Sequence, residues 1–325
     1  MNFNPLEALY GAVVGARNAF YDRGWLRVRA LQGSVVSVGN LSAGGSGKTP
    51  FVILLGELLK GSGIKFDVLS RGYGRKTRGV RLVEPGGLPR DFGDEPLLIA
   101  RRLQVSVVVG EDRYEAGRFA EAQFGPQMHL LDDGFQHRGL ARDFDIVLVT
   151  PEDARDRLLP GGRLREPLGA LRRADAVVLT SGASAESFPV ERKTVWRVRR
   201  GIVVQNVPPR PVVFCGIARP RNFSLQLRAA GIDPVAEAFF RDHHAYSEKD
   251  VRDLLQLRQQ SEAGGFVTTE KDAVNLGGYL DALKPMAVVP VKLELADAAN
   301  AVDTMLRVIE ERRGAREKMP VTARR

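Results

Sequence analysis

The chain has 325 residues, and 44% of them are hydrophobic, so it can bury one large core or two modest ones. Its single cysteine, Cys215, excludes an intrachain disulfide. The formal net charge of +9 favours an anionic partner, such as a nucleotide, a phosphorylated substrate or an acidic membrane, although charge also serves solubility. No RRM, KH or helix-turn-helix pattern accompanies the charge, so we expect no nucleic acid partner.

Residues 1–32 form the first expected unit, an amphipathic helix. Apolar residues recur at helical spacing, starting with Leu6 and Leu9, but charged residues interrupt them too often for a helix that crosses a bilayer. Two placements remain open from these residues alone. The helix either lies in a membrane interface, with Tyr21, Trp25 and arginines at headgroup level, or packs its apolar face on the protein's own core.

From residue 34 onward, apolar strands alternate with helices, which predicts parallel βαβ units. The strands are continuous runs of Val, Ile and Leu, as expected where helices cover both faces of a sheet. In a first domain over 33–205 we expect strands at 34–39, 65–70, 105–110, 128–133, 144–150 and 175–180. The predicted fold class is therefore α/β: a P-loop NTPase-type parallel sheet with helices on both faces, a second smaller α/β domain and the N-terminal helix.

The second domain is expected over 206–313, after a proline-rich linker that contains Pro208, Pro209 and Pro211. Its expected strands and helices are strands 212–217, 265–269 and 286–293, and helices 220–230, 247–262 and 297–313. Gly314 is expected to cap the last helix, ahead of a basic tail at 314–325. The sequence leaves open which domain this last helix packs against.

The stretch SVVSVGNLSAGGSGKTP, residues 34–50, predicts a phosphate-binding loop. It follows the strand–loop–helix pattern of a P-loop, G-x-x-x-x-G-K-S/T, except that Ser42 stands at the first glycine position. Backbone amides and the helix N-terminus would hold phosphate oxygens, Lys48 would reach the β- and γ-phosphates, and Thr49 would bind Mg²⁺. The expected nucleotide-binding residues are Ser42, Ala43, Gly44, Gly45, Ser46, Gly47, Lys48 and Thr49.

A P-loop enzyme needs an acid at the end of a neighbouring strand. MHLLDDGFQH supplies Asp132 and Asp133 directly after an apolar run, where a carboxylate can hold Mg²⁺ directly or through a water. The alternative is an ordinary surface turn, since Asp-Asp-Gly is common turn chemistry. The P-loop upstream favours the metal site.

Two basic loops also follow predicted strands. SRGYGR at 70–75 and GEDR at 110–113 come where binding loops lie in parallel sheets, beyond the carboxyl ends of the strands. Their arginines and tyrosine suit an anion or a sugar. The candidates are Arg71, Tyr73, Arg75 and Arg113.

Three further polar stretches each have two interpretations. FGDEP at 92–96 places Asp94 and Glu95 before Pro96 and a helical run, and the alternative is that Asp94 is a simple N-cap, with Pro96 near the first helical position. RDHHAYSEKD at 241–250 has two of the four histidines but no third ligand at metal-binding spacing. TTEKDAV at 268–274 is similar to the N/T-K-x-D guanine motif, but its lysine and aspartate are adjacent, which disfavours a GTPase.

Together these motifs resemble the tetraacyldisaccharide 4′-kinase family of Gram-negative bacteria, over about residues 1–310. The motifs that carry the resemblance, in chain order, are GNLSAGGSGKTP, SRGYGR, GDEP, EDR, DDGFQHR, LPGGRLREP, DHHAY and TTEKDAV. The resemblance implies ATP- and Mg²⁺-dependent phosphorylation of the 4′-hydroxyl of an acylated glucosamine disaccharide 1-phosphate, a precursor of lipid A. It also implies that residues 1–32 face the lipid surface on the cytoplasmic side of the inner membrane.

The same resemblance implies roles for residues at matching positions. Asp94 matches the family's proposed general base, His243 matches the histidine that pairs with it, and Lys48 serves the transferred phosphoryl group. The implied metal residues are Thr49, Asp132 and Asp133, with Glu95 and Gln136 as further metal-shell residues. The implied residues for the disaccharide and its phosphate are Arg71, Tyr73, Arg75 and Arg113.

One rival class shares the GGSGKT sequence: dimeric nucleotide switches and metallochaperone ATPases. Those proteins need a signature lysine early in the loop, where this chain has Leu41 and Ala43. A switch would release phosphate to water, whereas a kinase would place it on a lipid, so a radiolabel separates the two.

Overall fold

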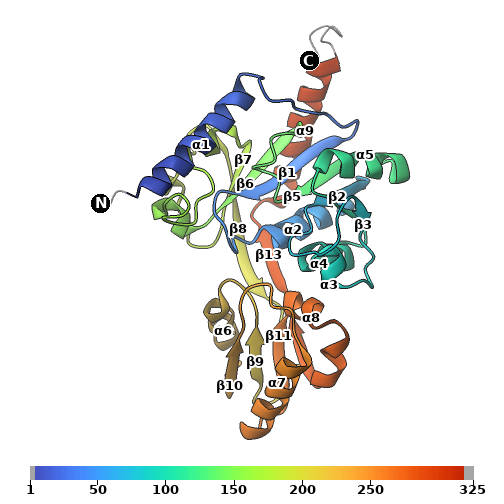
Figure 1. The fold of residues 1–325 in the computed structure, drawn as a ribbon, viewed down its shortest axis with the longest axis vertical. Helices are drawn as coiled ribbons and strands as arrows, with labels where there is room; N and C mark the ends of the chain where they lie inside the picture. Colours follow the sequence, from blue (N-terminus) through green and yellow to red (C-terminus); the bar gives the residue numbers. More distant parts are fainter. Residues whose placement is uncertain (1–3, 318–325) are drawn as a thin grey trace.

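Two sheets of unequal size organise the protein, whose computed structural model describes residues 4–317 (Figure 1). The large sheet contains β1 (Ser34–Asn40), β2 (Phe66–Ser70), β3 (Arg81–Leu82), β4 (Val107–Val109), β5 (Met128–Asp132), β6 (Phe144–Val149), β7 (Ala176–Leu179), β8 (Thr194–Ile202) and β13 (Val291–Leu295). The small sheet contains β9 (Val212–Cys215), β10 (Ala236–Phe239), β11 (Phe266–Thr269) and β12 (Met286–Val289). The predicted α/β class is confirmed.

The large sheet has the strand order β13-β8-β7-β6-β1-β5-β2-β4-β3. Its pairs are parallel except at the two edges, where β3 runs antiparallel to β4 and β13 antiparallel to β8. The small sheet has the order β10-β9-β11-β12 and is parallel throughout. The central strand β1 is buried along its whole length, which explains its unbroken apolar sequence.

Helices cover both faces of the large sheet. The α-helices of the described chain are α1 (Pro5–Asp22), α2 (Lys48–Gly61), α3 (Pro89–Phe92), α4 (Asp94–Leu103), α5 (Arg113–Phe124), α6 (Pro220–Ala229), α7 (Glu248–Gln260), α8 (Glu270–Leu276) and α9 (Ala298–Glu317). Val36 of β1 packs in a cluster with α2, α4 and α9, whereas its neighbour Val35 packs with α5. Successive side chains of a strand point to opposite faces, so these helices lie on opposite sides of the sheet.

The single strand expected over 286–293 is wrong. The chain forms β12 in the small sheet, passes through Pro290 and then forms β13 at the edge of the large sheet. Proline has no N–H for a ladder hydrogen bond, so it breaks a strand, while its carbonyl accepts from Val203 N at 3.1 Å. The chain thus enters the small sheet after β8 and leaves it before β13, through two strands that pair with each other (Figure 1).

Helix α9 returns to the large sheet, which answers the question that the sequence left open. Its buried Met305 and Ile309 belong to the cluster shared with α2. The helix runs through Gly314 to Glu317, so the expected cap at Gly314 is wrong. Ion pairs from Arg312 to Asp175 and from Arg316 to Asp143 hold this last part of the helix against the sheet. Residues 318–325 of the expected basic tail lie outside the described residues.

Helix α1 packs with its polar side inward. Asn18 is its only buried residue and donates to Glu166 at 2.7 Å, and Tyr10 Oη donates to the Arg165 carbonyl at 3.1 Å. Leu6, Leu9 and Val13 face outward and are 62%, 61% and 60% exposed. The alternative in which these apolar residues pack on the protein's own core is therefore wrong.

We call the part of the protein built on the large sheet the large lobe, and the part built on the small sheet the small lobe. Helix α1 runs along one side of the large lobe (Figure 1). Within residues 4–317, no helix combines the length and the apolar character that crossing a membrane requires. The outward apolar face of α1 remains without a protein partner among the described residues.

Candidate active site

The phosphate cradle lies between β1 and α2. Gly44 and Gly47 adopt φ values of 99° and 86°, which only glycine enters at little cost, and Gly47 is the N-cap residue directly before α2. A cavity of about 490 Å³ opens in front of this loop. All eight predicted nucleotide-binding residues, from Ser42 to Thr49, line it. The backbone amides at the start of α2 therefore border a space large enough for a ligand.

The cradle is pre-organised by a small ionic network. Lys48 Nζ donates to Asn40 Oδ1 at 2.9 Å and lies 3.5 Å from Asp133. Arg165 grips the carboxylate of Asp133 through two hydrogen bonds, at 3.0 and 2.8 Å, and also bonds Asn40. Burial alone would raise the pKa of Asp133, but Lys48 and Arg165 outweigh it and lower that pKa well below its usual range. Asp133 thus stays ionised and holds the two cations beside the cradle.

Asp132 behaves in the opposite way. It is 2% exposed, and burial, Glu95 and Asp133 together raise its pKa to about 7. Its Oδ2 accepts from Ser70 Oγ at 3.1 Å, while its buried Oδ1 has no hydrogen-bond partner. A buried carboxylate oxygen without a partner is costly unless a cation or a donor arrives there. Asp132 lines the same cavity as Thr49, so the pair offers oxygen ligands of the kind that Mg²⁺ prefers.

Within residues 4–317, no group of three or more His, Cys, Asp or Glu side chains is arranged to hold a metal by itself. Mg²⁺ in phosphoryl-transfer sites usually takes one or two carboxylates, while substrate phosphates and water fill the rest. Asp132 and Thr49 fit that ligand set. Glu95 also lines the cavity, whereas Gln136 does not: its Nε2 donates to the Asn40 carbonyl at 2.9 Å.

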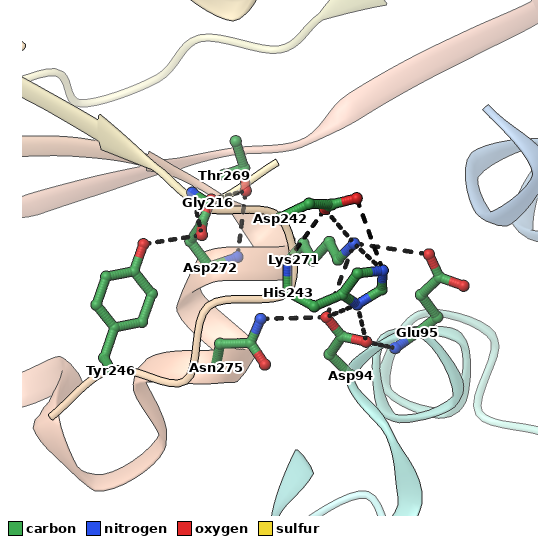
Figure 2. Close-up of polar contacts among 10 residues, drawn as sticks. All are labelled: Asp94, Glu95, Gly216, Asp242, His243, Tyr246, Thr269, Lys271, Asp272 and Asn275. Carbon is green, nitrogen blue, oxygen red and sulfur yellow. Dashed lines mark hydrogen bonds and ion pairs between the residues drawn. The ribbon is translucent and has the colours of Figure 1, made fainter. Parts of the chain in front are cut away.

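Asp94 and His243 meet across the gap between the two sheets. Asp94 is the first residue of α4, and His243 lies in the loop between β10 and α7. His243 Nδ1 is 3.0 and 2.9 Å from the two oxygens of Asp94 (Figure 2). Asn275 and the backbone N–H of Glu95 also donate to this carboxylate, at 3.1 and 2.9 Å. The interpretation of Asp94 as a plain helix N-cap is wrong, because Gly93 holds that position.

His243 is held in an unusual backbone conformation. Its φ is 56°, a region that non-glycine residues seldom enter. Its N–H donates to the Gly216 carbonyl at 3.2 Å, and the N–H of Gly216 donates to the buried carboxylate of Asp272 at 2.7 Å. Tyr246 donates to the same carboxylate at 2.9 Å (Figure 2). Asp272 thereby fixes the turn from which His243 reaches Asp94.

Lys271 occupies the centre of the same network. Its Nζ lies 3.1 Å from His243 Nε2 and 3.1 Å from Asp242, and within 3.8 Å of both Asp94 and Glu95 (Figure 2). A lysine ammonium only donates, so Nε2 accepts, and we assign the hydrogen of a neutral His243 to Nδ1, pointing at Asp94. Burial works against the charge of Lys271, but the three carboxylates outweigh burial and raise its pKa.

Asp94 and His243 shift each other's pKa values in opposite directions. Burial alone would raise the pKa of Asp94, but the hydrogen bond from His243 and the charge of Lys271 lower it. Burial alone would lower the pKa of His243, but the hydrogen bond to Asp94 raises it. Asp94 is 4% exposed and does not line the cavity, whereas His243 does. The imidazole is therefore the member of the pair that faces the ligand space.

The predicted sugar-binding residues divide into two groups. Arg71 and Tyr73 line the cavity, and the Tyr73 ring lies 5.3 Å from that of His243. Arg75 and Arg113 do not line it. Arg75 is bound to Glu111 and the Gly79 carbonyl, and Arg113 is 4% exposed and donates to the Gly110 and Glu111 carbonyls.

Sequence reasoning missed four residues of this site: Asn40, Arg165, Lys271 and Asn275. Arg165 and Lys271 stand in LPGGRLREP and TTEKDAV, two motifs that carry the family resemblance, but nothing there indicated their partners. Asn40 closes β1 directly before the cradle, and Asn275 lies one helical turn after Lys271. The helical spacing of Lys271 and Asn275, four residues apart on α8, was the one available signal that both face the same neighbour.

A phosphate cradle, a carboxylate at the end of the adjacent strand and room for a second substrate define the class: the protein is an α/β phosphotransferase of the P-loop type. Comparison with known proteins identifies the family. The family model described as "Tetraacyldisaccharide-1-P 4'-kinase" (LpxK) matches residues 1–310. The chain belongs to this family, and it is an enzyme of lipid A biosynthesis, a tetraacyldisaccharide 4′-kinase.

Individual relatives agree along nearly the whole chain. The chain is 53% identical to the tetraacyldisaccharide 4′-kinase of Koribacter versatilis, over 96% of this chain and 100% of that protein. It is 41% identical to the enzyme of Aquifex aeolicus, over 85% of this chain and 89% of that one. The crystal structure of Aquifex aeolicus LpxK in complex with ATP superposes with a TM-score of 0.79 at 36% identity, covering 94% of this chain and 98% of that chain.

Proposed function

We propose that the protein transfers the γ-phosphoryl group of ATP to the 4′-hydroxyl of its lipid acceptor with Mg²⁺, and that the Asp94–His243 pair takes the hydroxyl proton. The observation that carries the proposal is the shared cavity. The phosphate cradle lines one wall, and His243 and Lys271 line another, so phosphoryl donor and hydroxyl acceptor can meet there. Residues of the expected first domain, 33–205, and of the expected second domain, 206–313, both contribute.

In the transfer, the bond between the γ-phosphorus and the bridging oxygen of ATP breaks, and a bond from phosphorus to the 4′-oxygen forms. In phosphoryl transfer the protein mainly positions the reactants and neutralises charge. Lys48, held by Asn40 and Asp133, supplies a fixed positive charge beside the cradle. His243 Nε2 would exchange its hydrogen bond from Lys271 for one from the 4′-hydroxyl and take that proton. The Nδ1–H points at Asp94, whose carboxylate would stabilise the resulting imidazolium.

For Mg²⁺, we propose Thr49 and Asp132 as the residues that hold the ion, with Glu95 close by. The buried Oδ1 of Asp132 supports this choice, because Asp132 lines the cavity and this oxygen has no hydrogen-bond donor of its own. When bound, Mg²⁺ would neutralise charge on the phosphate oxygens. Asp133 is less suited, since Arg165 and Lys48 already occupy its carboxylate.

We also propose that α1 sits on the lipid surface of the inner membrane, on its cytoplasmic side. The outward face of Leu6, Leu9 and Val13, together with Trp25 at 68% exposure, supports an interfacial helix. The acceptor carries four acyl chains, so the enzyme must meet it at such a surface.

The test is transfer of a γ-labelled phosphoryl group to a defined tetraacyldisaccharide 1-phosphate in mixed micelles, followed by thin-layer separation. We expect label in the lipid fraction, dependent on added Mg²⁺ and lost in the His243→Ala variant. Label released only as inorganic phosphate would overturn the kinase assignment. Transfer that survives both Asp94→Ala and His243→Ala would overturn the proposed role of the pair.

A further inference from the structure

Residues 163–166, here called the bridging segment, lie between helix α1 and the phosphate cradle. Toward the helix, Tyr10 Oη donates to the Arg165 carbonyl at 3.1 Å, and Asn18 Nδ2 donates to the Glu166 carboxylate at 2.7 Å. Asn18 itself is buried. The inward side of the helix therefore holds this segment by side-chain hydrogen bonds, one at each of its last two residues.

On its other side, the bridging segment pairs with the backbone of the cradle. The N–H of Ala43 donates to the Arg163 carbonyl at 2.7 Å, and the N–H of Arg165 donates to the Leu41 carbonyl at 2.6 Å. An antiparallel bridge joins the two stretches between these bonds. The first part of the cradle thus has a strand-like partner, and the position of that partner sets the position of the cradle.

Arg165 and Glu166 extend this link to opposite sides. Successive side chains of an extended chain point in opposite directions, and here Arg165 reaches the cradle whereas Glu166 reaches α1. Arg165 binds Asp133 through two hydrogen bonds and also contacts Asn40. Both of these partners hold Lys48. A continuous chain of polar contacts therefore runs from the helix to the lysine of the cradle.

Glu166 is a buried carboxylate, 2% exposed, that depends on its donors. Arg173 binds both of its oxygens, at 2.8 and 3.0 Å, and Asn18 supplies a third hydrogen bond. Burial alone would raise the pKa of Glu166, but Arg173 and then Asn18 outweigh burial and lower that pKa. Removing a donor from a buried charge is costly, so the side chain would shift to regain one. Loss of the Asn18 amide should therefore move the bridging segment.

We propose that α1 is part of the support of the phosphate cradle, and that Asn18 and Tyr10 are positioning residues for Arg165 and Lys48. The helix thus has two separable tasks. Its outward apolar face is the proposed lipid contact, whereas its inward polar face holds the bridging segment against the cradle. The inference rests on the proposed role of the cradle in holding ATP, but not on contact between α1 and lipid.

The experiment compares full-length variants of the two faces of α1. Asn18→Leu removes the amide donor with little change in volume, and Tyr10→Phe removes only a hydroxyl. Leu9→Ser alters the outward face and is the matched control. Three quantities are measured: kcat at saturating ATP and lipid, the Kd of ATP without lipid, and co-sedimentation with phosphatidylglycerol vesicles.

The two faces should give opposite patterns. For Asn18→Leu we expect kcat to fall about tenfold and ATP affinity about threefold, with vesicle binding unchanged, because the cradle is misplaced. For Tyr10→Phe we expect about a twofold loss of kcat, since a hydrogen bond between neutral groups is weaker than one to a charge. Leu9→Ser should weaken vesicle binding and leave ATP affinity unchanged. Asn18→Gln, which keeps an amide, should recover part of kcat.

Double-mutant cycles distinguish positioning from a general loss of stability. Asn18→Leu is combined with Arg165→Met, in the same chain of contacts, and separately with Lys271→Met, in the network across the cavity. We expect Asn18→Leu to lower kcat little further in the Arg165→Met protein, and by its full factor in the Lys271→Met protein.

An unchanged kcat in Asn18→Leu, or additive losses in both cycles, would overturn the inference. A loss of activity that follows a loss of vesicle binding would also overturn it, because Asn18 would then belong to the lipid contact. Circular dichroism checks that each variant is folded, and Tyr10→Phe tests the same link if Asn18→Leu does not fold. A wild type that fails to bind ATP would instead contradict the proposed cradle, on which the inference rests.

Discussion

The phosphate cradle and the Asp94–His243–Lys271 network line the same cavity but are built in different ways. The cradle comes from one continuous stretch, 42–49, and its partners hold it in place locally. The network joins α4 of the large lobe to the β10–α7 loop and α8 of the small one. A contiguous site is fixed by local backbone chemistry, whereas a site assembled across two sheets depends on how the sheets are held together.

The largest effect is expected at the cradle itself. Lys48→Ala should lower kcat/KM by a factor on the order of 10³, because it removes a fixed charge beside the transferring phosphoryl group. Lys60→Ala is the matched control, since Lys60 lies in the last turn of the same helix and outside the cavity. Steady-state kinetics at saturating lipid measure both variants. A loss below tenfold in a folded Lys48→Ala protein would contradict the assigned role.

Replacing Asp132 with Asn should reduce activity and at the same time stabilise the protein. Its pKa of about 7 in the folded protein exceeds the unfolded value of about 3.9, so the folded state binds more protons between these values and stability falls as pH rises through that window. Asp132→Asn should therefore stabilise the nucleotide-free protein at pH 8, by on the order of 3 kcal/mol, and hardly at pH 4. The same variant should lose Mg²⁺-dependent transfer.

Thermal unfolding without Mg²⁺ at both pH values checks this expectation, with Asp133→Asn as the comparison. Asp133 has a lowered pKa and two cationic partners, so removing its charge should destabilise the protein at pH 8. Equal changes in stability from the two substitutions would contradict the opposite pKa shifts described for Asp132 and Asp133.

Lys271 should matter through His243. Its charge lowers the pKa of His243, so Lys271→Met should raise that pKa and move the acid limb of the kcat/KM profile to higher pH. Near neutral pH we expect about a tenfold loss of kcat, and a smaller loss at high pH. An unshifted profile with uniformly reduced kcat would indicate only a structural role.

The smallest effect is expected at an ion pair that also bridges the two lobes. Arg102 of α4 contacts Glu270 of α8 at 2.8 Å, and both side chains are partly exposed. Arg102→Met should cost about 1 kcal/mol of unfolding free energy or less and leave kcat unchanged. Denaturant unfolding and kinetics would measure the two quantities. A large fall in kcat here would mean that any contact between the lobes affects catalysis. That result would contradict a specific catalytic role for the Asp94–His243 pair.

The sequence predicted those features of the fold that depend on residues close together along the chain. The alternation of apolar strands and helices gave the α/β class, and the pattern around Gly47 and Lys48 identified the cradle, because such patterns follow from backbone geometry. Strand β8 was missed because its arginines interrupt the apolar run, and its burial alternates only in part. The path of the chain after Pro290 was missed because β13 pairs with β8, from Val291 with Ile202 to Leu295 with Val198, and no local pattern records pairs so far apart in the sequence.

In the candidate active site too, the sequence predicted the local motifs but not the contacts between distant segments. The motif resemblance placed Asp94 beside His243, but the residues alone could not, since they are far apart in the sequence. The role of Lys271 was missed in the sequence, because its motif TTEKDAV was compared only with the N/T-K-x-D guanine motif. Its partners come from two other segments, so its position became apparent only from the fold. The inward polar face of α1 likewise reverses the usual rule for amphipathic helices, and only the contacts of Asn18 and Tyr10 reveal it.

The most direct test of the central claim, that Asp94 and His243 act as one unit across the two lobes, is a double-mutant cycle on kcat. Asp94→Ala, His243→Ala and the double variant are compared with the wild type at saturating ATP and lipid, with ATP affinity measured in parallel. We predict that each single variant loses most of kcat with ATP affinity nearly intact, and that the double variant is little worse than the poorer single one. Fully additive losses, or a wild-type kcat for His243→Ala, would contradict the account.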